Sequence, residues 1–262
     1  MEIAGYLAAL LIGVSMGLIG GGGSILTVPI LVYLFHISPT HAISYSLFIV
    51  GFTSLIGAVR NYRRNLVNLK TVGLFGISSI TTVFISRKFI IPFLPEVFFK
   101  INGFEVTHSF FVMVVFALLM FTAAMFMIKS KQGAGKPHYR KPLVLMLFGL
   151  GIGLVTGFLG AGGGFLLVPA LVIFMNLPIK EAIGTSLMII ALNSLIGFLG
   201  DFGLHPIKWN FLLIFTAIAI GGMYLGLYFN KKVDSIKLKK GFGWFIMAMA
   251  FFIIIKEFLP DN

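Results

Sequence analysis

The sequence predicts an all-α, polytopic membrane protein made of two inverted repeats. Three observations support this fold class. Of the 262 residues, 58% are hydrophobic and only 11% are charged, which leaves too little polar surface for a soluble domain of this length. Several apolar runs are long enough to cross roughly 30 Å of hydrocarbon. A glycine-rich motif also occurs twice, once in each half of the chain.

The repeated motif is a run of glycines between two apolar segments. It reads GGGGSILTVP at residues 20–29 and GAGGGFLLVP at residues 160–169, which is 140 residues later and without a gap. The sequence SLIG recurs at the same offset, at 54–57 and 194–197. We therefore expect a duplicated unit. The expected division is a first transmembrane repeat at 1–128, a basic linker at 129–141 and a second transmembrane repeat at 142–262.

Each expected repeat begins with a pair of helices that its glycines interrupt. The pairs are 3–19 with 24–35, and 143–159 with 165–175. Glycine disfavours a continuous helix, and the second member of each pair is too short to cross a bilayer alone. The sequence therefore predicts a glycine-tipped pair that is broken or re-entrant. Three transmembrane helices follow in each repeat, at 40–59, 69–87 and 106–128, and at 180–199, 207–229 and 242–258.

The positions of Lys and Arg favour an inverted arrangement. If each glycine pair crossed the membrane once, the basic loops would divide roughly eleven to nine, without the bias that orients membrane proteins. If each pair returns to its starting face, roughly fifteen basic residues share one face, in loops 60–70, 129–141 and 231–240 and at Lys180. We expect these loops to be cytoplasmic, both termini to be non-cytoplasmic, and the protein to lie in the inner (plasma) membrane. The other face keeps Arg87, Lys88, Lys100, Lys208 and Lys256.

Composition and motifs argue against several other functions. A net charge of +12 would suggest nucleic acid as a partner of a soluble protein, but here the basic loops serve membrane orientation. Cysteine is absent, which removes thiolate catalysis and cysteine-ligated metals. Walker A, H-E-x-x-H and G-x-S-x-G signatures are missing. We expect no enzyme activity, no cofactor and no metal; the expected partners are the lipid bilayer and a small anion, and a homo-oligomer is compatible with the sequence.

The glycine motifs form the first candidate substrate site. Glycine-broken segments at matching positions in two halves point to a transporter's binding site near the middle of the membrane. The helix after each tip has N–H groups, around residues 24–25 and 164–165, that lack intrahelical acceptors, and its dipole favours an anion. Alternatively, the glycines serve helix packing only. The candidate binding residues here are Gly21, Gly22, Gly23, Ser24, Gly162, Gly163 and Gly164.

Polar side chains on the helix after each glycine pair form the second candidate set. Ser46 matches Ser186 at the 140-residue offset, and Thr53 matches Asn193, seven residues further along each helix. This spacing places each pair on one helical face, where it can line a polar path or make ordinary interhelical contacts. Thr185 completes the set. Asp201 and the histidines near residue 40 read more simply as interfacial or loop residues.

These motifs resemble those of a known family. GLIGGGGSILTVP at 17–29, its copy at 157–169, EAIGTSL at 181–187 and NLVNLK at 65–70 are similar to the TauE/SafE family of sulfite and organosulfonate exporters. The first half departs from the pattern, with Ser44-Tyr45-Ser46 in place of Gly184-Thr185-Ser186. The resemblance covers nearly the whole chain and implies export of a small sulfur-containing anion without ATP hydrolysis.

The residues themselves indicate a small anion and no particular one. We expect alternating access around two opposed glycine tips. Two other classes stay open at this point. One is an anion channel with the same site, and the other is a membrane scaffold or assembly protein in which the glycine motifs are packing elements.

Overall fold

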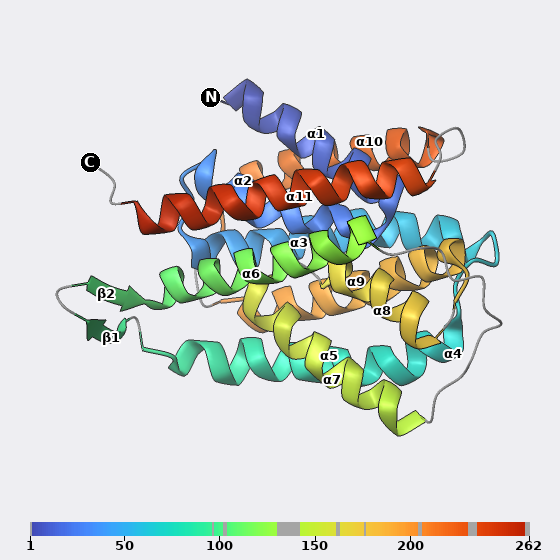
Figure 1. Cartoon of the computed structure of the whole chain (residues 1–262), viewed down its shortest axis with the longest axis horizontal. Coiled ribbons are helices and arrows are strands. Elements are labelled where there is room, and N and C mark those ends of the chain that lie inside the picture. The colour runs from blue at the N-terminus through green and yellow to red at the C-terminus, as the bar shows by residue number, and fades with distance from the viewer. Residues whose placement is uncertain are drawn as a thin grey trace.

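The computed structural model describes residues 2–95, 97–101, 104–129, 142–160, 163–175, 177–203, 206–229 and 235–259. Within these ranges the chain is helical apart from one short hairpin, and most helices run along the length of the molecule (Figure 1). The first half contains α1 (Glu2–Ile19), η1 (Gly21–Leu26), α2 (Thr27–Tyr33), α3 (Pro39–Tyr62), α4 (Leu69–Thr71), η2 (Val72–Gly76), α5 (Ile77–Ile85), η3 (Ser86–Ile90), η4 (Ile91–Phe93), β1 (Val97–Ile101), β2 (Phe104–Thr107) and α6 (His108–Lys129). The second half contains α7 (Pro142–Leu159), α8 (Gly164–Met175), α9 (Ile179–Asp201), α10 (Trp209–Phe229) and α11 (Ser235–Phe258).

Helices of membrane-spanning length confirm the all-α polytopic class. Five helices in the described residues are long and apolar enough to cross a bilayer. The glycine-motif segments 5–19, 23–33 and 143–159 are apolar but shorter. The predicted helix at 242–258 is present as the greater part of α11, which lies against α6. The five spans are Pro39–Tyr62, Leu69–Phe93, His108–Met125, Lys180–Asp201 and Trp209–Phe229.

Two local features differ from the expectation. The helix expected at 69–87 continues to Phe93 and contains two π-helical turns, η2 and η3. Strands β1 and β2 pair antiparallel ahead of α6, so Val106 and Thr107 belong to a strand and not to a helix. The sequence signal for this hairpin is the Asn102-Gly103 dipeptide between runs of β-branched and aromatic residues.

The first glycine pair leaves one end of the molecule and returns to it. Helix α1 ends at Gly20, whose φ of 81° is the left-handed conformation that glycine adopts without strain. The chain then runs back through η1 and α2, so Phe35 lies against the start of α1. The ring centroids of Tyr6 and Phe35 are 6.3 Å apart, and a Cβ on Gly5 would overlap the ring of Phe35.

The second glycine pair makes the same kind of turn from the opposite end. Gly160 follows α7 with a φ of 65°, and α8 then returns. Leu145, near the start of α7, belongs to the same small cluster as Leu171 and Met175 on α8. Each pair is therefore a helical hairpin whose two ends lie at the same end of the molecule, and we call these two hairpins the re-entrant pairs.

Contacts between the halves recur at the 140-residue offset. Gly13 on α1 packs against Ala219 on α10, and the corresponding pair, Gly153 on α7 and Ser79 on α5, packs in the same way. Helices α3 and α9 lie against each other and run antiparallel, because Ser44, early in α3, contacts Asp201 at the end of α9. These contacts are those expected of a duplicated unit; the division of the chain at residues 129–141 stays a prediction, and residues 130–141 lie outside the described ranges.

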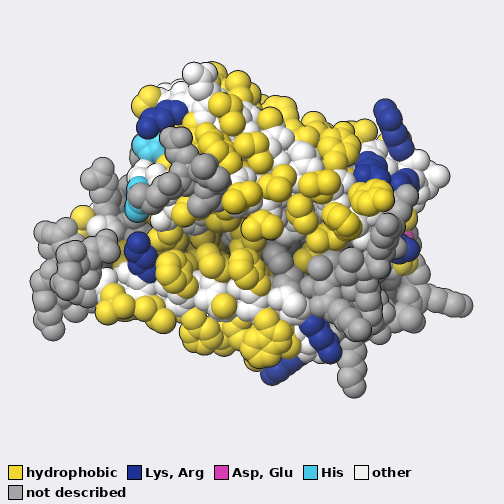
Figure 2. All heavy atoms as spheres, turned by 90° about the horizontal axis from the view of Figure 1, so that it is seen from above, with side chains coloured by type: hydrophobic (Ala, Val, Ile, Leu, Met, Phe, Trp, Pro, Cys, Tyr) yellow, Lys and Arg dark blue, Asp and Glu magenta, His cyan; other side chains and the backbone are white. Residues whose placement is uncertain are grey.

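The molecule has two ends, which carry different elements of the chain. We call the end that carries both chain termini and the β-hairpin the terminal end, and the end with α4 the opposite end (Figure 1). A hydrogen bond of 2.8 Å from Tyr33 to Glu257 joins α2 to α11 at the terminal end. The apolar side chains form a broad belt, with Lys and Arg side chains at both ends of it (Figure 2). This distribution is that of a protein surrounded by lipid.

Close packing at glycine generates a first prediction. A Cβ on Gly13 of α1 would lie 2.8 Å from the carbonyl carbon of Ala219 on α10. A Cβ on Gly221, which is in α10 as well, would meet nothing within 4 Å. We expect Gly13→Ala to destabilise the protein by about 1–3 kcal/mol because backbone must move. Gly221→Ala should leave stability equal or slightly higher. Thermal unfolding in detergent checks both, and equal melting temperatures would contradict the packing role of Gly13.

Candidate functional site

The two glycine tips touch each other in the interior. A Cβ on Gly21 would lie 2.6 Å from the Cα of Gly164, so neither position has room for a side chain. Gly20 faces Ile183 on α9, and Gly160 faces Ile43 on α3. The two contacts are equivalent, because the 140-residue offset relates Gly20 to Gly160 and Ile43 to Ile183. Because η1 begins at Gly21 and α8 begins at Gly164, two helix N-termini meet at this contact.

The backbone donors at the first tip differ in position from the expected ones. Residues 21–26 form a 3₁₀ helix that continues into α2, and in such a helix each N–H bonds to the carbonyl three residues earlier. The N–H groups without intrahelical acceptors therefore belong to Gly21 and Gly22 and not to residues 24–25. The hydroxyl of Ser24 donates to the carbonyl of Gly21 at 2.7 Å, which stabilises this tight turn. A run of glycines accepts such a turn because no side chains crowd it.

The second tip is described from Gly163 onward, and Gly162 lies outside the described residues. Gly163 has a φ of 66° and packs against the side chain of Thr156. Its carbonyl accepts hydrogen bonds of 3.0 Å from the N–H groups of Leu166 and Leu167. The first turn of α8 is therefore formed, and its leading N–H groups lie at the contact with Gly21.

Several buried hydroxyl groups on α3 and α9 have no hydrogen-bond partner. Ser46 and Thr53, both predicted site residues, are fully buried, and their oxygens are unpaired among the described residues. Ser54 and Ser194, which match at the 140-residue offset, share this property. An unsatisfied buried hydroxyl costs about 1–3 kcal/mol, so such groups call for a partner from water or a ligand.

The other predicted side chains are already engaged. Asn193 donates to the Ser79 hydroxyl at 2.6 Å, while its carbonyl oxygen has no partner. Ser186 donates to the Ile183 carbonyl at 2.9 Å. Thr185 accepts the backbone N–H of Asn68 at 2.9 Å, which ties it to the α3–α4 loop at the opposite end of the molecule. The glycine tips are thus brought together, but Thr185 is held by a neighbouring loop.

A buried ionic cluster at the terminal end was missed by the sequence analysis. Arg87 is 2% exposed and pairs with Asp201, and Ser44 hydrogen-bonds to both. Arg87 also donates to the carbonyl of Gly157 at 3.3 Å, so the cluster joins η3, α3, α9 and α7. The available signal was an arginine and an aspartate next to long apolar runs, which in membranes are usually paired and functional.

Comparisons with known proteins agree with the resemblance noted in the sequence. Residues 5–253 match the family described as "Sulfite exporter TauE/SafE". A "Probable membrane transporter protein" of Xylella fastidiosa is 26% identical, over 93% of this chain and 91% of its own length. The Bacillus subtilis proteins YdhB and YunE, both named probable membrane transporter proteins, are 25% and 29% identical over 89% and 86% of this chain and 92% and 87% of their own lengths. No solved structure matches the chain.

The buried ionic cluster generates a second prediction. Removing one partner of a buried pair leaves an uncompensated charge and costs about 3–5 kcal/mol. We therefore expect Arg87→Met and Asp201→Leu each to lower the unfolding temperature strongly. The double variant, with an apolar pair in place of the charges, should unfold closer to the intact protein than either single variant. Denaturant unfolding in detergent of all four proteins gives the coupling energy, and strictly additive losses would contradict a direct pair.

Proposed function

The chain belongs to the sulfite exporter TauE/SafE family, and from this premise we propose that it carries a small sulfur-containing oxyanion or organosulfonate across the membrane. That it is a membrane transporter follows from the family and from its apolar helices. The proposed reaction is export by alternating access, without ATP hydrolysis. The substrate is held where the two glycine tips meet.

Two opposed helix N-termini make an anion site from neutral groups. The N–H groups of Gly21 and Gly22 and those at the start of α8 have no acceptors in their own helices, and each helix adds roughly half a positive charge at this end. Glycine allows an anion to approach these donors directly. Without a full positive charge at the contact, the anion is released more easily than from a buried lysine, which suits a carrier.

The observation that carries this proposal is the set of fully buried, unpaired hydroxyls on α3 and α9. Ser46, Thr53, Ser54 and Ser194 lie on the two helices that pack against the glycine tips. Native proteins rarely leave such groups without partners. A hydrated path or a bound anion between α3 and α9 would supply the acceptors and donors that these hydroxyls lack.

Access to the site from the two sides would require different contacts to open. At the terminal end, the Arg87–Asp201 pair and Ser44 connect α3 to α9. At the opposite end, Asn68 of the α3–α4 loop hydrogen-bonds to Thr185 and Glu181 on α9. We propose that these two sets of contacts open alternately while the re-entrant pairs hold the site.

Orientation in the membrane generates a third prediction. We propose that the opposite end is cytoplasmic, because it contains Arg60 in the last turn of α3 and Arg63 and Arg64 in the α3–α4 loop. The natural chain contains no cysteine, so single cysteines can be labelled without background. An exposed Lys88→Cys should react with an impermeant maleimide in intact cells, whereas an exposed Arg63→Cys should react only after permeabilisation. The reverse pattern would contradict the proposed orientation, in which the opposite end is cytoplasmic.

Removal of an unpaired hydroxyl generates a fourth prediction. Ser46→Ala deletes a group that has no hydrogen-bond partner in the described part of the chain, so we expect unchanged or slightly higher stability. If the hydroxyl binds substrate, flux should fall by about tenfold, as expected for the loss of one hydrogen bond to a charged ligand. Thr53→Val tests the same point about two helical turns further along α3. Thr81→Val is the control, because Thr81 is exposed on the outer surface of α5.

The assay is uptake of labelled sulfite, sulfate, thiosulfate and a small alkanesulfonate into proteoliposomes. Saturable flux of one anion that falls in Ser46→Ala but not in Thr81→Val supports the proposal. Currents far above carrier turnover would indicate a channel. Absence of flux under both a proton gradient and a membrane potential would favour the scaffold interpretation.

A further inference from the structure

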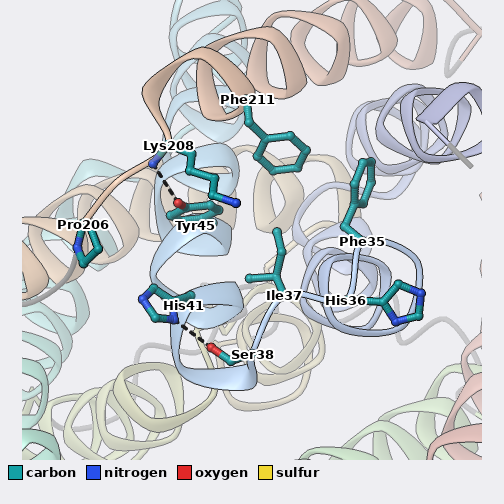
Figure 3. Close-up of a pocket in the computed structure, with 9 residues that line it drawn as sticks. All are labelled: Phe35, His36, Ile37, Ser38, His41, Tyr45, Pro206, Lys208 and Phe211. Carbon is teal, nitrogen blue, oxygen red and sulfur yellow. Dashed lines mark hydrogen bonds between the residues drawn. The ribbon is translucent and has the colours of Figure 1, made fainter.

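A cavity that is separate from the glycine contact opens at the terminal end of the molecule. It has a volume of about 410 Å³ and lies between the α2–α3 turn, the first turns of α3 and the start of α10 (Figure 3). Its volume is within the range of small-molecule sites. It is lined by Phe35, His36, Ile37, Ser38, His41, Tyr45, Pro206, Lys208 and Phe211.

The polar groups of this cavity are suited to an anion. The ammonium group of Lys208 extends between Tyr45 and Phe211, above the open centre of the pocket (Figure 3). The backbone N–H of Lys208 donates to the Tyr45 hydroxyl at 2.8 Å, which fixes the start of α10 against α3. Helices α3 and α10 both begin at this pocket, so their dipoles add to the positive potential. No Asp or Glu is among the lining residues.

One part of the cavity wall is apolar. The rings of Phe35 and Phe211 meet edge to face with centroids 5.0 Å apart, and Phe211 also packs beside Tyr45 at 6.2 Å. Ile37 projects toward the same space (Figure 3). A purely inorganic anion would leave this apolar surface uncovered. An anion with a short hydrocarbon group would cover it and gain about 25 cal/mol for each Å² of apolar surface buried.

Comparison with the repeat-related position indicates that the cationic character is particular to this end. The Lys208–Tyr45 hydrogen bond corresponds, at the 140-residue offset, to the bond from Asn68 to Thr185, and both are backbone N–H to hydroxyl contacts. The counterparts of Lys208 and His41 are Asn68 and Glu181, which hydrogen-bond to each other at 3.0 Å. The same backbone arrangement therefore carries an ammonium group and an imidazole at the terminal end, and an amide and a carboxylate at the opposite end.

We propose that this pocket is a second binding site, distinct from the glycine contact, for a singly charged oxyanion attached to a short apolar group. Lys208 and the two helix N-termini hold the sulfonate or phosphate head, and Phe35, Ile37 and Phe211 cover the apolar part. Two sources share this chemistry, a soluble organosulfonate and the head group of an anionic lipid at the membrane surface. Occupancy of this pocket does not depend on whether the glycine contact carries flux.

Equilibrium binding to the purified full-length protein in an uncharged detergent tests the proposal. The probes are propane-1-sulfonate, methanesulfonate and sulfate, measured by isothermal titration calorimetry. We expect propane-1-sulfonate to bind tightest and sulfate weakest. Lys208→Met should weaken binding of propane-1-sulfonate at least tenfold. Lys88→Met, an exposed lysine of the same end that does not line the pocket, should change it less than twofold.

A second variant and a lipid arm separate the remaining outcomes. Ile37→Glu places a carboxylate in the pocket and should abolish binding at this pocket even if Lys208→Met folds poorly. Competition by phosphatidylglycerol micelles, but not by phosphatidylcholine, would assign the site to a lipid head group, and absence of competition would assign it to a soluble solute. Equal binding by the intact protein and Lys208→Met, or no binding of any probe, would overturn the proposal. The binding lost in Lys208→Met reports on this pocket and the flux lost in Ser46→Ala reports on the glycine contact, so a failure of the glycine site and a failure of this pocket give different results.

Discussion

The fold depends on one constraint, which is that a peptide backbone in hydrocarbon must find its hydrogen-bond partners within the protein. Full-length helices such as α3 and α9 meet this requirement by themselves. The two re-entrant pairs do not, because each is broken at its glycines. They are tolerated because the breaks lie inside the protein, with Gly21 against Gly164, and not against lipid. The place where the backbone is least satisfied is thus the centre of the candidate site.

Small residues make this arrangement possible. Between helices in lipid there is little hydrophobic driving force, so association depends on close van der Waals contact. The approach of α1 to α10 at Gly13, and of α7 to α5 at Gly153, brings backbone against backbone. Each re-entrant pair is thereby held by a long helix of the other half. The halves are consequently interlocked, and neither encloses the glycine contact alone.

Charge distinguishes the two ends of this nearly symmetric framework. Ser44 and Asp201 have Gly184 and Asn61 as their counterparts at the 140-residue offset, so the buried ionic cluster has no equivalent at the opposite end. The terminal pocket with Lys208 differs from its counterpart in the same direction. The alternating access proposed above requires the two entrances to open at different times, so their contacts need to differ. The polar differences between the repeats are located where such a distinction would arise.

The sequence alone determined the class of protein and the location of the re-entrant pairs. Hydropathy, helix length and the repeated glycine motif are local properties, and they identified the spans, the breaks at Gly20 and Gly160, and the candidates Ser46 and Thr53. Tertiary structure decided which side chains meet. Arg87 and Asp201 are 114 residues apart, and Lys208 and Tyr45 are 163 apart, so no pattern along the chain predicts either pairing. It also placed the free N–H groups at Gly21 and Gly22 and assigned Thr185 to a loop contact. The physical reason is that burial and partnership depend on how helices of the two halves pack, whereas hydrophobicity and glycine content belong to each segment itself.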